Sequence, residues 1–362
     1  MELAKITVTI VFINSLRFFF NFRIQGTPIM VWKWTKRIGI GGLSVVSFCL
    51  IFGILYQSIA TKLDEQKYPP FGQMIDVGGF RLHLFGTGKI DGPVVILEAG
   101  LGSHSLDWAL VQSSVSEFAR VYSYDRAGYG WSEESPNERT SINMVEELHT
   151  LLNKAGISGP YILVGHSLGG INVRLFASRY PNEVAGVVLV DSSHEDQFDN
   201  MPKLAVPNQT LIHLINYLGI IRLLSYSAKY QATNEVYGKL PENIQQIKIV
   251  QDRATKTIKT VFRENSFIQT SLLQLKNDGG NLGNIPLIVI TARQTMPPMD
   301  GSGITQEEID KFHPIFLELQ KDLLKKSAHS TQIFAEESDH NIPLRQPEII
   351  VKAIQSIIEC TY

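Results

Sequence analysis

A serine framed by two glycines is the first feature of this sequence that could do chemistry. Residues 165–169 read Gly-His-Ser-Leu-Gly, with Ser167 at the centre. The apolar run 161–166 ends directly before this serine and a helical pattern opens directly after it, which predicts a tight strand-to-helix turn. Such a turn exposes the hydroxyl, and the first N–H groups of the helix can stabilise an oxyanion. The pattern therefore predicts a nucleophilic serine; the alternative is a serine that only caps the helix.

A nucleophilic serine needs a general base, and the chain contains nine histidines. General base catalysis requires a side chain whose pKa lies near neutrality, which favours histidine. We predict His340, which lies between the last strand-like run and the last helical run. His166 adjoins the serine and is expected to be structural, whereas His329 precedes the last strand, at the wrong end of a sheet. His194 is a weaker alternative.

Short strand-like runs and helical patterns alternate along the chain around these residues. Residues 73–88 read as a β-hairpin with Gly78 and Gly79 at its turn. Apolar runs with little alternation suit strands that are covered on both faces, and they occur at 94–99, 119–125, 161–166, 184–191, 286–292 and 331–336. Helical patterns occupy 141–155, 168–180, 306–326 and 346–358. This order predicts parallel βαβ units and an α/β fold.

The interval between Asp191 and Pro286 interrupts this alternation. It contains no strong strand and several stretches with helical spacing. We predict a helical cap over 197–284, because a long helical insertion between two sheet strands is a natural lid. Its apolar residues could shape a pocket for an acyl chain, although ordinary cap core is the interpretation we favour for Leu211, Leu214, Ile215, Leu218, Ile220 and Ile221.

Four motifs in order resemble those of the α/β-hydrolase superfamily, and the resemblance covers roughly 72–358. Residues 97–108 are similar to the glycine-rich oxyanion loop, 123–132 resemble the D-R-x-G-x-G-x-S segment, 165–169 match the nucleophile elbow, and His340 is the late histidine. The resemblance implies a mostly parallel eight-stranded sheet flanked by helices, with a helical cap. A serine at the elbow separates this chain from haloalkane dehalogenases and epoxide hydrolases, which carry an aspartate there.

The resemblance also implies which backbone groups would bind an oxyanion. They are the N–H of Leu168, which follows the nucleophile, and the N–H of Leu101, whose neighbouring glycines allow the loop to approach. Asp125 and Arg126 carry charge but are interpreted as a structural network that braces the neighbouring glycines.

The acid that would orient the histidine is where the sequence departs from the common pattern of the superfamily. Many members carry it shortly after the strand predicted at 286–292, yet the first acid there is Asp300, in a loop rich in proline and glycine. Asp191, at the end of the preceding strand, would share the carboxyl edge of the sheet with Ser167. We rank Asp191 first and Asp300 second, with two further candidates, Glu195 and Asp196.

An uncharged apolar run near the amino terminus predicts a membrane anchor. Residues 38–56 would form a helix of roughly 28 Å at about 1.5 Å per residue, which is close to the hydrocarbon thickness of a bilayer. Lys33, Lys36 and Arg37 precede this run, whereas the charges after it nearly cancel. The positive-inside rule then places 1–37 in the cytoplasm and the body outside. A cleaved signal peptide is the alternative, but the run is longer than a usual signal sequence and no clear small-residue cleavage site follows.

Charge and cysteine content exclude several classes of protein. Of 33 basic and 35 acidic residues, six basic and one acidic lie in the first 37 positions, so a basic head precedes an acidic body. A net charge of −2 argues against a nucleic-acid binder. Cys49 and Cys360 cannot make a disulfide framework, and no Cys/His cluster suggests a metal site. Residues 6–20 could form a second, poorer membrane segment, and translation could instead begin at Met30.

The predicted activity is cleavage of a carboxylic ester or related acyl compound by Ser167, His340 and Asp191, without a cofactor or metal. The expected partners are a small acyl or ester substrate and the membrane. An acyltransferase or amidase with the same triad, and a catalytically silent binding protein on this fold, remain alternatives. The expected organisation is a basic segment 1–37, a transmembrane helix 38–56, a linker 57–71, a hydrolase core 72–196 and 285–362, and a cap 197–284.

Overall fold

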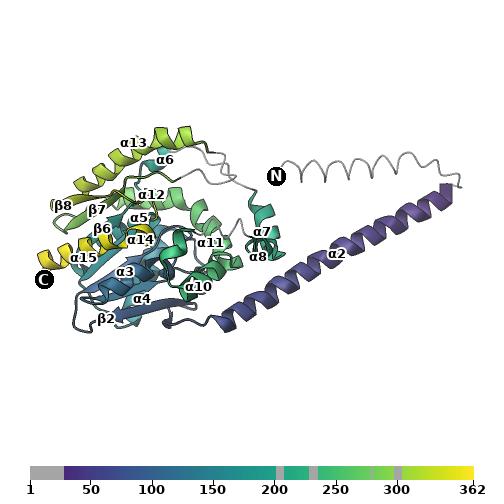
Figure 1. Ribbon diagram of the computed structural model, residues 1–362, viewed down its shortest axis with the longest axis horizontal. Coiled ribbons are helices and arrows are strands. Elements are labelled where there is room, and N and C mark those ends of the chain that lie inside the picture. Colours follow the sequence, from purple (N-terminus) through teal and green to yellow (C-terminus); the bar gives the residue numbers. More distant parts are fainter. Residues whose placement is uncertain (1–27, 201–207, 228–234, 279, 297–303) are drawn as a thin grey trace. The chain divides into compact units, whose positions relative to one another are not determined.

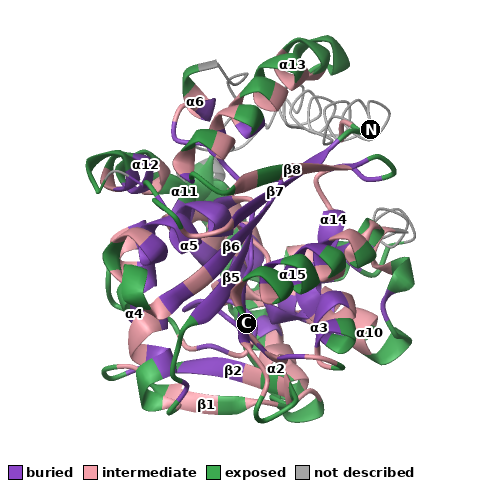
Figure 2. Cartoon of the chain, turned by 90° about the vertical axis from the view of Figure 1, so that its left-hand side faces the viewer, coloured by how far each residue is buried: buried purple, intermediate pink, exposed green. Residues whose placement is uncertain are grey.

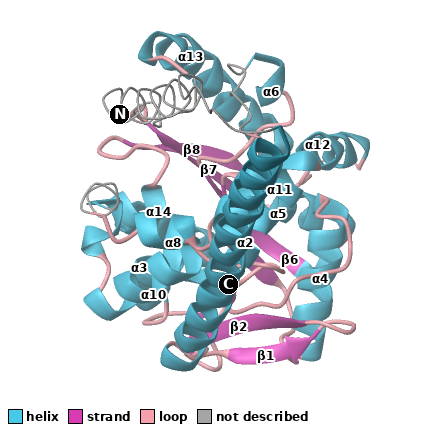
Figure 3. Cartoon of the chain, turned by 90° about the vertical axis from the view of Figure 1, so that its right-hand side faces the viewer, coloured by secondary structure: helices cyan, strands magenta, loops and turns pink. Residues whose placement is uncertain are grey.

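An eight-stranded sheet forms the centre of the structure, a computed structural model that describes residues 28–200, 208–227, 235–278, 280–296 and 304–362. The spatial order is β1-β2-β4-β3-β5-β6-β7-β8. β2 lies toward one edge of the sheet and β8 forms the other edge (Figures 1 and 3). The strands are β1 (Gln73–Asp76), β2 (Arg81–Gly88), β3 (Val94–Glu98), β4 (Arg120–Tyr124), β5 (Tyr161–His166), β6 (Val184–Val190), β7 (Leu287–Ala292) and β8 (Ser330–Ala335). β2 runs antiparallel to β1 and β4, and every other pair is parallel. The mostly parallel sheet expected from the alternating pattern is therefore confirmed.

Helices cover both faces of this sheet (Figure 2). One face carries α4 (Ser141–Lys154) and α5 (Leu168–Arg179), and the other carries α3 (Ala109–Val115) and α15 (Pro347–Thr361). Every residue of β5 and β7 is buried, which explains why these runs show no polar alternation in the sequence. The short helix α14 (Ile342–Arg345), between β8 and α15, was not expected.

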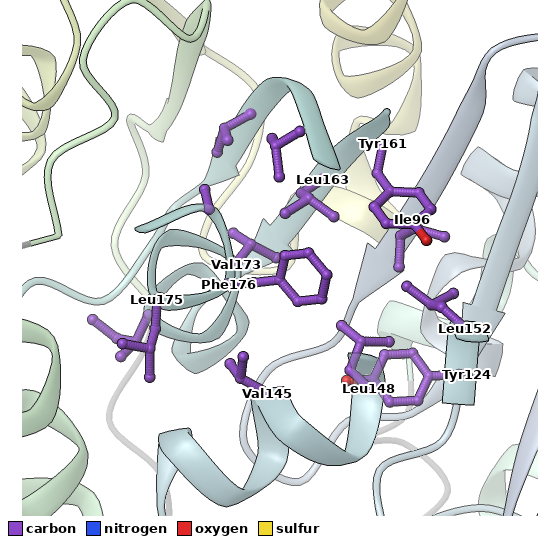
Figure 4. Packing of buried hydrophobic residues seen from close by; sticks show 14 of the residues in the cluster. Ile96, Tyr124, Val145, Leu148, Leu152, Tyr161, Leu163, Val173, Leu175 and Phe176 are labelled. Carbon is purple, nitrogen blue, oxygen red and sulfur yellow. The ribbon is translucent and has the colours of Figure 1, made fainter. Parts of the chain in front are cut away.

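Apolar packing fixes α5 against the sheet at the end of the helix away from the turn that carries Ser167. Phe176 of α5 lies among Tyr161 and Ile96 of the sheet and Leu148 of α4 (Figure 4). The rings of Tyr161 and Phe176 meet edge to face, with centroids 6.0 Å apart, an arrangement that aromatic pairs favour. The strand before the serine and the helix after it are thus held as one rigid unit.

Helices fill the described part of the chain between β6 and β7. They are α6 (Gln197–Asn200), α7 (Gln209–Tyr217), α8 (Ile220–Leu224), η3 (Glu235–Lys239), α10 (Glu242–Asp252), α11 (Thr255–Ser266) and α12 (Ile268–Asn277). Leu211, Leu214 and Ile220 were interpreted as cap core, but their side chains are exposed. α7 and α8 instead bury polar side chains, among them Asn216 and Arg222, whereas Ile215, Leu218 and Ile221 of the same predicted set are half-buried.

One long helix, α2 (Pro28–Lys67), precedes the sheet. Its stretch Trp32–Lys67 is long and apolar enough to cross a membrane and has a mean hydropathy of 2.4 over its most apolar window. The chain divides into two compact units at the Leu55–Tyr56 bond, within this helix. The second membrane segment predicted at 6–20 lies outside the described residues.

The first part of the predicted linker 57–71 is helical, because α2 continues through Lys67. No helix-breaking residue occurs in this stretch before Pro69. The helix is also held from outside, since the buried Arg222 of α8 forms an ion pair with Asp64. Polar composition alone could not reveal this tertiary contact.

Candidate active site

Ser167 lies on a strained turn between β5 and α5. Its backbone angles, φ 53° and ψ −122°, fall outside the regions that residues other than glycine favour. Backbone hydrogen bonds hold it there: the N–H of Ser167 donates to Val190 O at 3.1 Å, and its carbonyl accepts from Ser193 N at 2.9 Å. The end of β6 therefore supports a turn that sets the serine at the carboxyl edge of the sheet.

Two glycines make this turn possible because the backbones around it approach closely. A Cβ on Gly165 would lie 2.6 Å from the carbonyl oxygen of Gly169. A Cβ on Gly169 would lie 2.5 Å from the carbonyl oxygen of Glu98 at the end of β3. No side chain fits at either position, which is the physical reason for a glycine two residues before and two residues after the serine.

The loop after β3 lies directly against the serine. A Cβ on Gly100 would lie 3.0 Å from the Cβ of Ser167. Within the described part of the chain, the N–H groups of Leu101 in this loop and Leu168 at the start of α5 have no hydrogen-bond acceptor. Two unpaired N–H groups beside a serine, one of them at a helix amino terminus, are suited to bind an anionic oxygen.

His340 and Asp191 are brought together at the same edge of the sheet. His340 Nδ1 and Asp191 Oδ2 are 2.6 Å apart. The other carboxylate oxygen, Oδ1, accepts a hydrogen bond from Ala292 N at 2.9 Å, so the carboxylate is fixed at both ends. Asp191 has a φ of 43°, and this left-handed turn directly follows β6. The predicted base and the first-ranked acid are therefore in contact.

His166 links the nucleophile turn to the loop that carries His340. Its Nε2–H donates to the backbone carbonyl of His340 at 2.8 Å, and the centroids of the two rings are 4.6 Å apart. No hydrogen bond joins the Ser167 hydroxyl to His340 among the described residues. In enzymes this contact is often long without substrate and tightens in the complex. The role of His166 as a brace for His340 was not specified by the sequence, which marked it only as structural.

The two histidines have opposite pKa shifts. Burial lowers the pKa of His166 to about 4, helped by the nearby His340, so His166 is neutral at physiological pH. Burial also opposes charge on His340, but the hydrogen bond and the negative charge of Asp191 outweigh it and raise the pKa of His340. His340 is therefore the ring that can accept a proton at this site.

The remaining acid candidates contact other partners. Glu195 accepts from Arg174 at 2.7 and 3.1 Å and from Lys326 at 2.6 Å. Asp196 forms an ion pair with Lys276 at 2.6 Å. Both carboxylates are thus committed to cations rather than to His340.

Asp300, His194 and His329 are the three other positions that were considered for the site. Asp300 lies outside the described residues. His194 lies beside Asp322, with 3.3 Å between Nε2 and Oδ2. His329 directly precedes β8, at its amino end. In the part of the chain that the structure describes, neither histidine side chain is bonded to a residue of the serine turn.

Arg126 has a role that sequence reasoning missed. Instead of bracing the glycines beside it, it donates to the carbonyl oxygens of Ala99 at 2.5 Å and Gly100 at 2.8 Å. Glu264 of α11 grips the same guanidinium through two bonds of 2.9 Å, and Glu98 accepts a third at 3.1 Å. All three charged side chains are buried. A cap helix therefore helps to hold the loop that contains Leu101.

Tyr129 adds a second connection between the cap and this loop. Its hydroxyl donates to Glu264 at 3.0 Å and accepts from Gly102 N at 3.2 Å. Glu264 and Arg126 are separated by 138 positions along the chain, so only the folded structure could show the pair. Across the described ranges, no group of three or more His, Cys, Asp or Glu residues is arranged to hold a metal ion.

Comparison with known proteins agrees with this architecture. The alpha/beta hydrolase fold family matches residues 92–354, which include the serine turn, Asp191 and His340. The chain belongs to this family.

Relatives of this alpha/beta hydrolase come from fungi and bacteria. The probable transporter efuK of Hormonema carpetanum is 26% identical over 315 residues, 79% of this chain but only 42% of efuK. The uncharacterized protein YbdG of Bacillus subtilis is 24% identical over 329 residues, 89% of this chain and 96% of YbdG. An uncharacterized vacuolar membrane protein of Saccharomyces cerevisiae is 36% identical over 109 residues, 29% of this chain and 17% of that protein.

Solved structures share the fold at low sequence identity. Cfl2 from Burkholderia cenocepacia has a TM-score of 0.58 at 18% identity and covers 79% of this chain and 95% of its own. The epoxide hydrolase CorEH has a TM-score of 0.56 at 14% identity, covering 80% and 99%. The enol-lactonase from Burkholderia xenovorans has a TM-score of 0.53 at 16% identity, covering 79% and 100%. Proteins that catalyse different reactions thus share this hydrolase fold, so the fold alone does not determine the activity.

The close packing at the elbow predicts that Gly169→Ala destabilises the protein. The added Cβ meets backbone atoms that cannot move aside, so we expect a loss of about 1–3 kcal/mol in the free energy of unfolding. Gly238→Ala is the control, because a Cβ there meets no atom within 4 Å. Thermal unfolding of the two purified variants measures the difference, and equal stability would show that the turn is not tightly packed.

The buried charge network predicts a large cost for Arg126→Ala. The substitution leaves Glu98 and Glu264 buried without their cation, for which we expect a loss of about 3–5 kcal/mol. Lys311→Ala is the matched control, because it removes an exposed partner of Glu307 and should cost less than about 1 kcal/mol. Denaturant unfolding compares the two variants, and a small loss for Arg126→Ala would contradict the assigned role.

Proposed function

We propose that this chain is a membrane-anchored serine hydrolase that cleaves a carboxylic ester or related acyl compound. Ser167 is the nucleophile, His340 the general base and Asp191 the acid that orients the base. The observation that carries the proposal is the hydrogen bond between His340 and Asp191, formed at the sheet edge where the strained turn presents Ser167. A hydroxyl, an imidazole with a raised pKa and a fixed carboxylate are the groups that acyl transfer requires.

In the first half of the reaction, Ser167 Oγ attacks the acyl carbon while His340 Nε2 takes the hydroxyl proton. The carbonyl oxygen becomes an oxyanion, which the N–H groups of Leu101 and Leu168 stabilise. Asp191 keeps Nδ1 protonated and stabilises the imidazolium that forms. When the intermediate collapses, the bond to the alkoxy group breaks and His340 returns the proton to the departing alcohol. The product is an acyl group on Ser167.

In the second half, water replaces the alcohol. His340 removes a proton from the water as it attacks the acyl carbon, and the same N–H pair stabilises the second oxyanion. Collapse of this intermediate breaks the bond to Ser167 Oγ, which recovers its proton from His340. A carboxylic acid leaves and the free enzyme is restored, so the cycle needs no cofactor.

The serine favours this chemistry over that of the epoxide hydrolase among the structural relatives. That chemistry, as the superfamily resemblance implies, uses an aspartate at the elbow, where this chain has Ser167. A likeness at 14% identity concerns the fold alone and does not transfer the activity.

The proposed location is a membrane, with α2 as a single-pass anchor. Its apolar length supports this, as does the name of the Saccharomyces cerevisiae relative as a vacuolar membrane protein. The basic residues before 38–56 support a topology with the amino terminus in the cytoplasm and the hydrolase body on the opposite side.

The nucleophile is tested by Ser167→Ala. We expect it to abolish labelling by a fluorophosphonate probe and to lower turnover of p-nitrophenyl esters by at least about a thousandfold, because triad members act as a unit. Ser178→Ala, at the far end of the same helix, should keep both properties, since its hydroxyl bonds only Asp278 O at 2.8 Å. Near-normal turnover by folded Ser167→Ala would overturn the proposal, and a panel of chain lengths would show the preferred acyl group.

The acid is tested by the pH profile of Asp191→Asn. His340 must be neutral to act as the base, so activity rises as the pH increases through its pKa. Because Asp191 raises that pKa above the ordinary 6.5, the wild-type acidic limb should lie above pH 6.5 and should move to lower pH in the variant. Turnover should also fall by about 10³–10⁴-fold.

Asp300→Asn is the matched control for this experiment. If Asp191 is the acid, the control keeps both the turnover and the acidic limb of the wild type. A wild-type profile in Asp191→Asn together with loss of activity in Asp300→Asn would transfer the role to Asp300.

A further inference from the structure

Two neighbouring cap helices present an unusual surface. Between Asn208 and Ser227, the only Lys, Arg, Asp or Glu residue is Arg222, and it is buried. The large side chains that are exposed on α7, α8 and the residue just beyond them are instead apolar or aromatic. This set, named here the α7–α8 surface, consists of Leu211, Leu214, Tyr217, Ile220, Leu223, Leu224 and Tyr226.

Several polar residues of these helices face the protein interior, whereas Gln209 and Thr210 at the start of α7 are exposed. Asn216 is buried and its side-chain amide donates to Thr255 O of α11 at 3.5 Å. Ser225 is buried and its hydroxyl accepts from Arg253 at 2.6 Å. A helix on a soluble protein places its apolar side inward and its polar side in water. The partly inverted arrangement here exposes a group of apolar side chains with no charged residue among them, which marks an interaction surface.

The position of this surface in the chain indicates what covers it. Tyr56 is the last residue of the predicted span 38–56, and its ring is so close to Gly219 that a Cβ there would lie 2.8 Å from Cδ1. One residue further on, Gln57 Oε1 accepts from Arg222 at 2.9 Å. Asp64, two turns later, forms an ion pair with the same arginine. The chain therefore leaves the predicted span directly beside the turn that joins α7 to α8.

We propose that the α7–α8 surface docks into the interfacial layer of the bilayer that α2 spans. The transfer of leucine and isoleucine side chains from water to the outer acyl region is favourable. The two tyrosines, Tyr217 and Tyr226, suit the boundary between acyl chains and headgroups. A surface without charged side chains avoids the large cost of desolvating a charge on entering this layer. The inference rests on the proposed anchoring by α2.

Docking at this surface would reach the active site through α11. α7 packs on α11, where the rings of His213 and Phe262 have centroids 5.3 Å apart (Figure 1). Two residues after Phe262, Glu264 holds the arginine that bonds the carbonyls of Ala99 and Gly100. One cap helix thus connects the lipid-facing pair of helices to the loop beside the nucleophile.

The test places a fluorescent label on single cysteines of the full chain in phosphatidylcholine vesicles that contain doxyl-labelled lipid. In a Cys49→Ser, Cys360→Ser background, Leu223→Cys reports on the α7–α8 surface and Leu273→Cys of α12 is the control. The two leucines are 57% and 58% exposed, so they differ in place rather than in exposure. Leu214→Cys of α7 is a second reporter in case the first variant fails to fold.

We expect doxyl lipid to cause a several-fold greater loss of fluorescence at 223 and 214 than at 273. Equal, weak quenching at all three positions would overturn the proposal. A dry environment at 223 that doxyl lipid does not quench would also overturn it, in favour of a protein partner. A chain that keeps only Cys49 tests the anchor separately: quenching at Cys49 without quenching at 223 refutes docking but leaves the anchor, whereas no quenching at Cys49 refutes the anchor itself.

Discussion

The hydrogen bond between His340 Nδ1 and Asp191 Oδ2 is the contact on which the candidate site depends. It joins the loop after β8 to the end of β6, two segments far apart in the sequence. The bond and the negative charge of Asp191 raise the pKa of His340 against the opposing effect of burial, and the bond also fixes the tautomer of the ring. With this hydrogen bond, Nδ1 is the nitrogen that donates to Asp191, and Nε2 remains available to the substrate. The left-handed turn at Asp191 and the bond from Ala292 serve to hold this carboxylate in place.

The serine and the oxyanion loop are positioned by different forces. Steric exclusion controls the serine, because β5, α5 and the end of β3 meet so closely that only glycine fits at 165 and 169. Buried charge controls the loop, where Arg126 lies between Glu98 and Glu264 and bonds two loop carbonyls. Burial raises the pKa of Glu98, although Arg126 opposes this shift. Removing one member would leave a buried charge uncompensated, which makes the cap and the loop a single electrostatic unit.

Local pattern was enough to predict the sheet and the serine turn. Apolar runs of strand length and the spacing of Gly165, Ser167 and Gly169 reflect constraints that act within a few residues. The choice between Asp191 and Asp300 could not be made in this way, because an acid follows each of two adjacent strands and the sequence does not show which side chain turns toward His340.

Contacts between residues far apart in the sequence explain the other differences between the predictions and the structure. Asp64, near the end of the helix that runs through Lys67, pairs with Arg222, and the partners of Arg126 include Glu264 of α11. The exposed leucines of the cap were expected in a core because helical spacing shows that a face is apolar, not whether that face turns inward. For the helix end and for Arg126, the contacting residue is more than a hundred positions away in the sequence. For the cap leucines, the environment of the exposed face lies outside the chain itself.

A crystal structure of the protein with a phosphonate bound covalently to the serine tests the central claim most directly. The phosphonyl oxygen stands in for the oxyanion of the reaction. We predict a bond from phosphorus to Ser167 Oγ, hydrogen bonds from the N–H groups of Leu101 and Leu168 to this oxygen, and an intact contact between His340 and Asp191. An adduct on another residue, or a phosphonyl oxygen that contacts neither N–H group, would contradict the account.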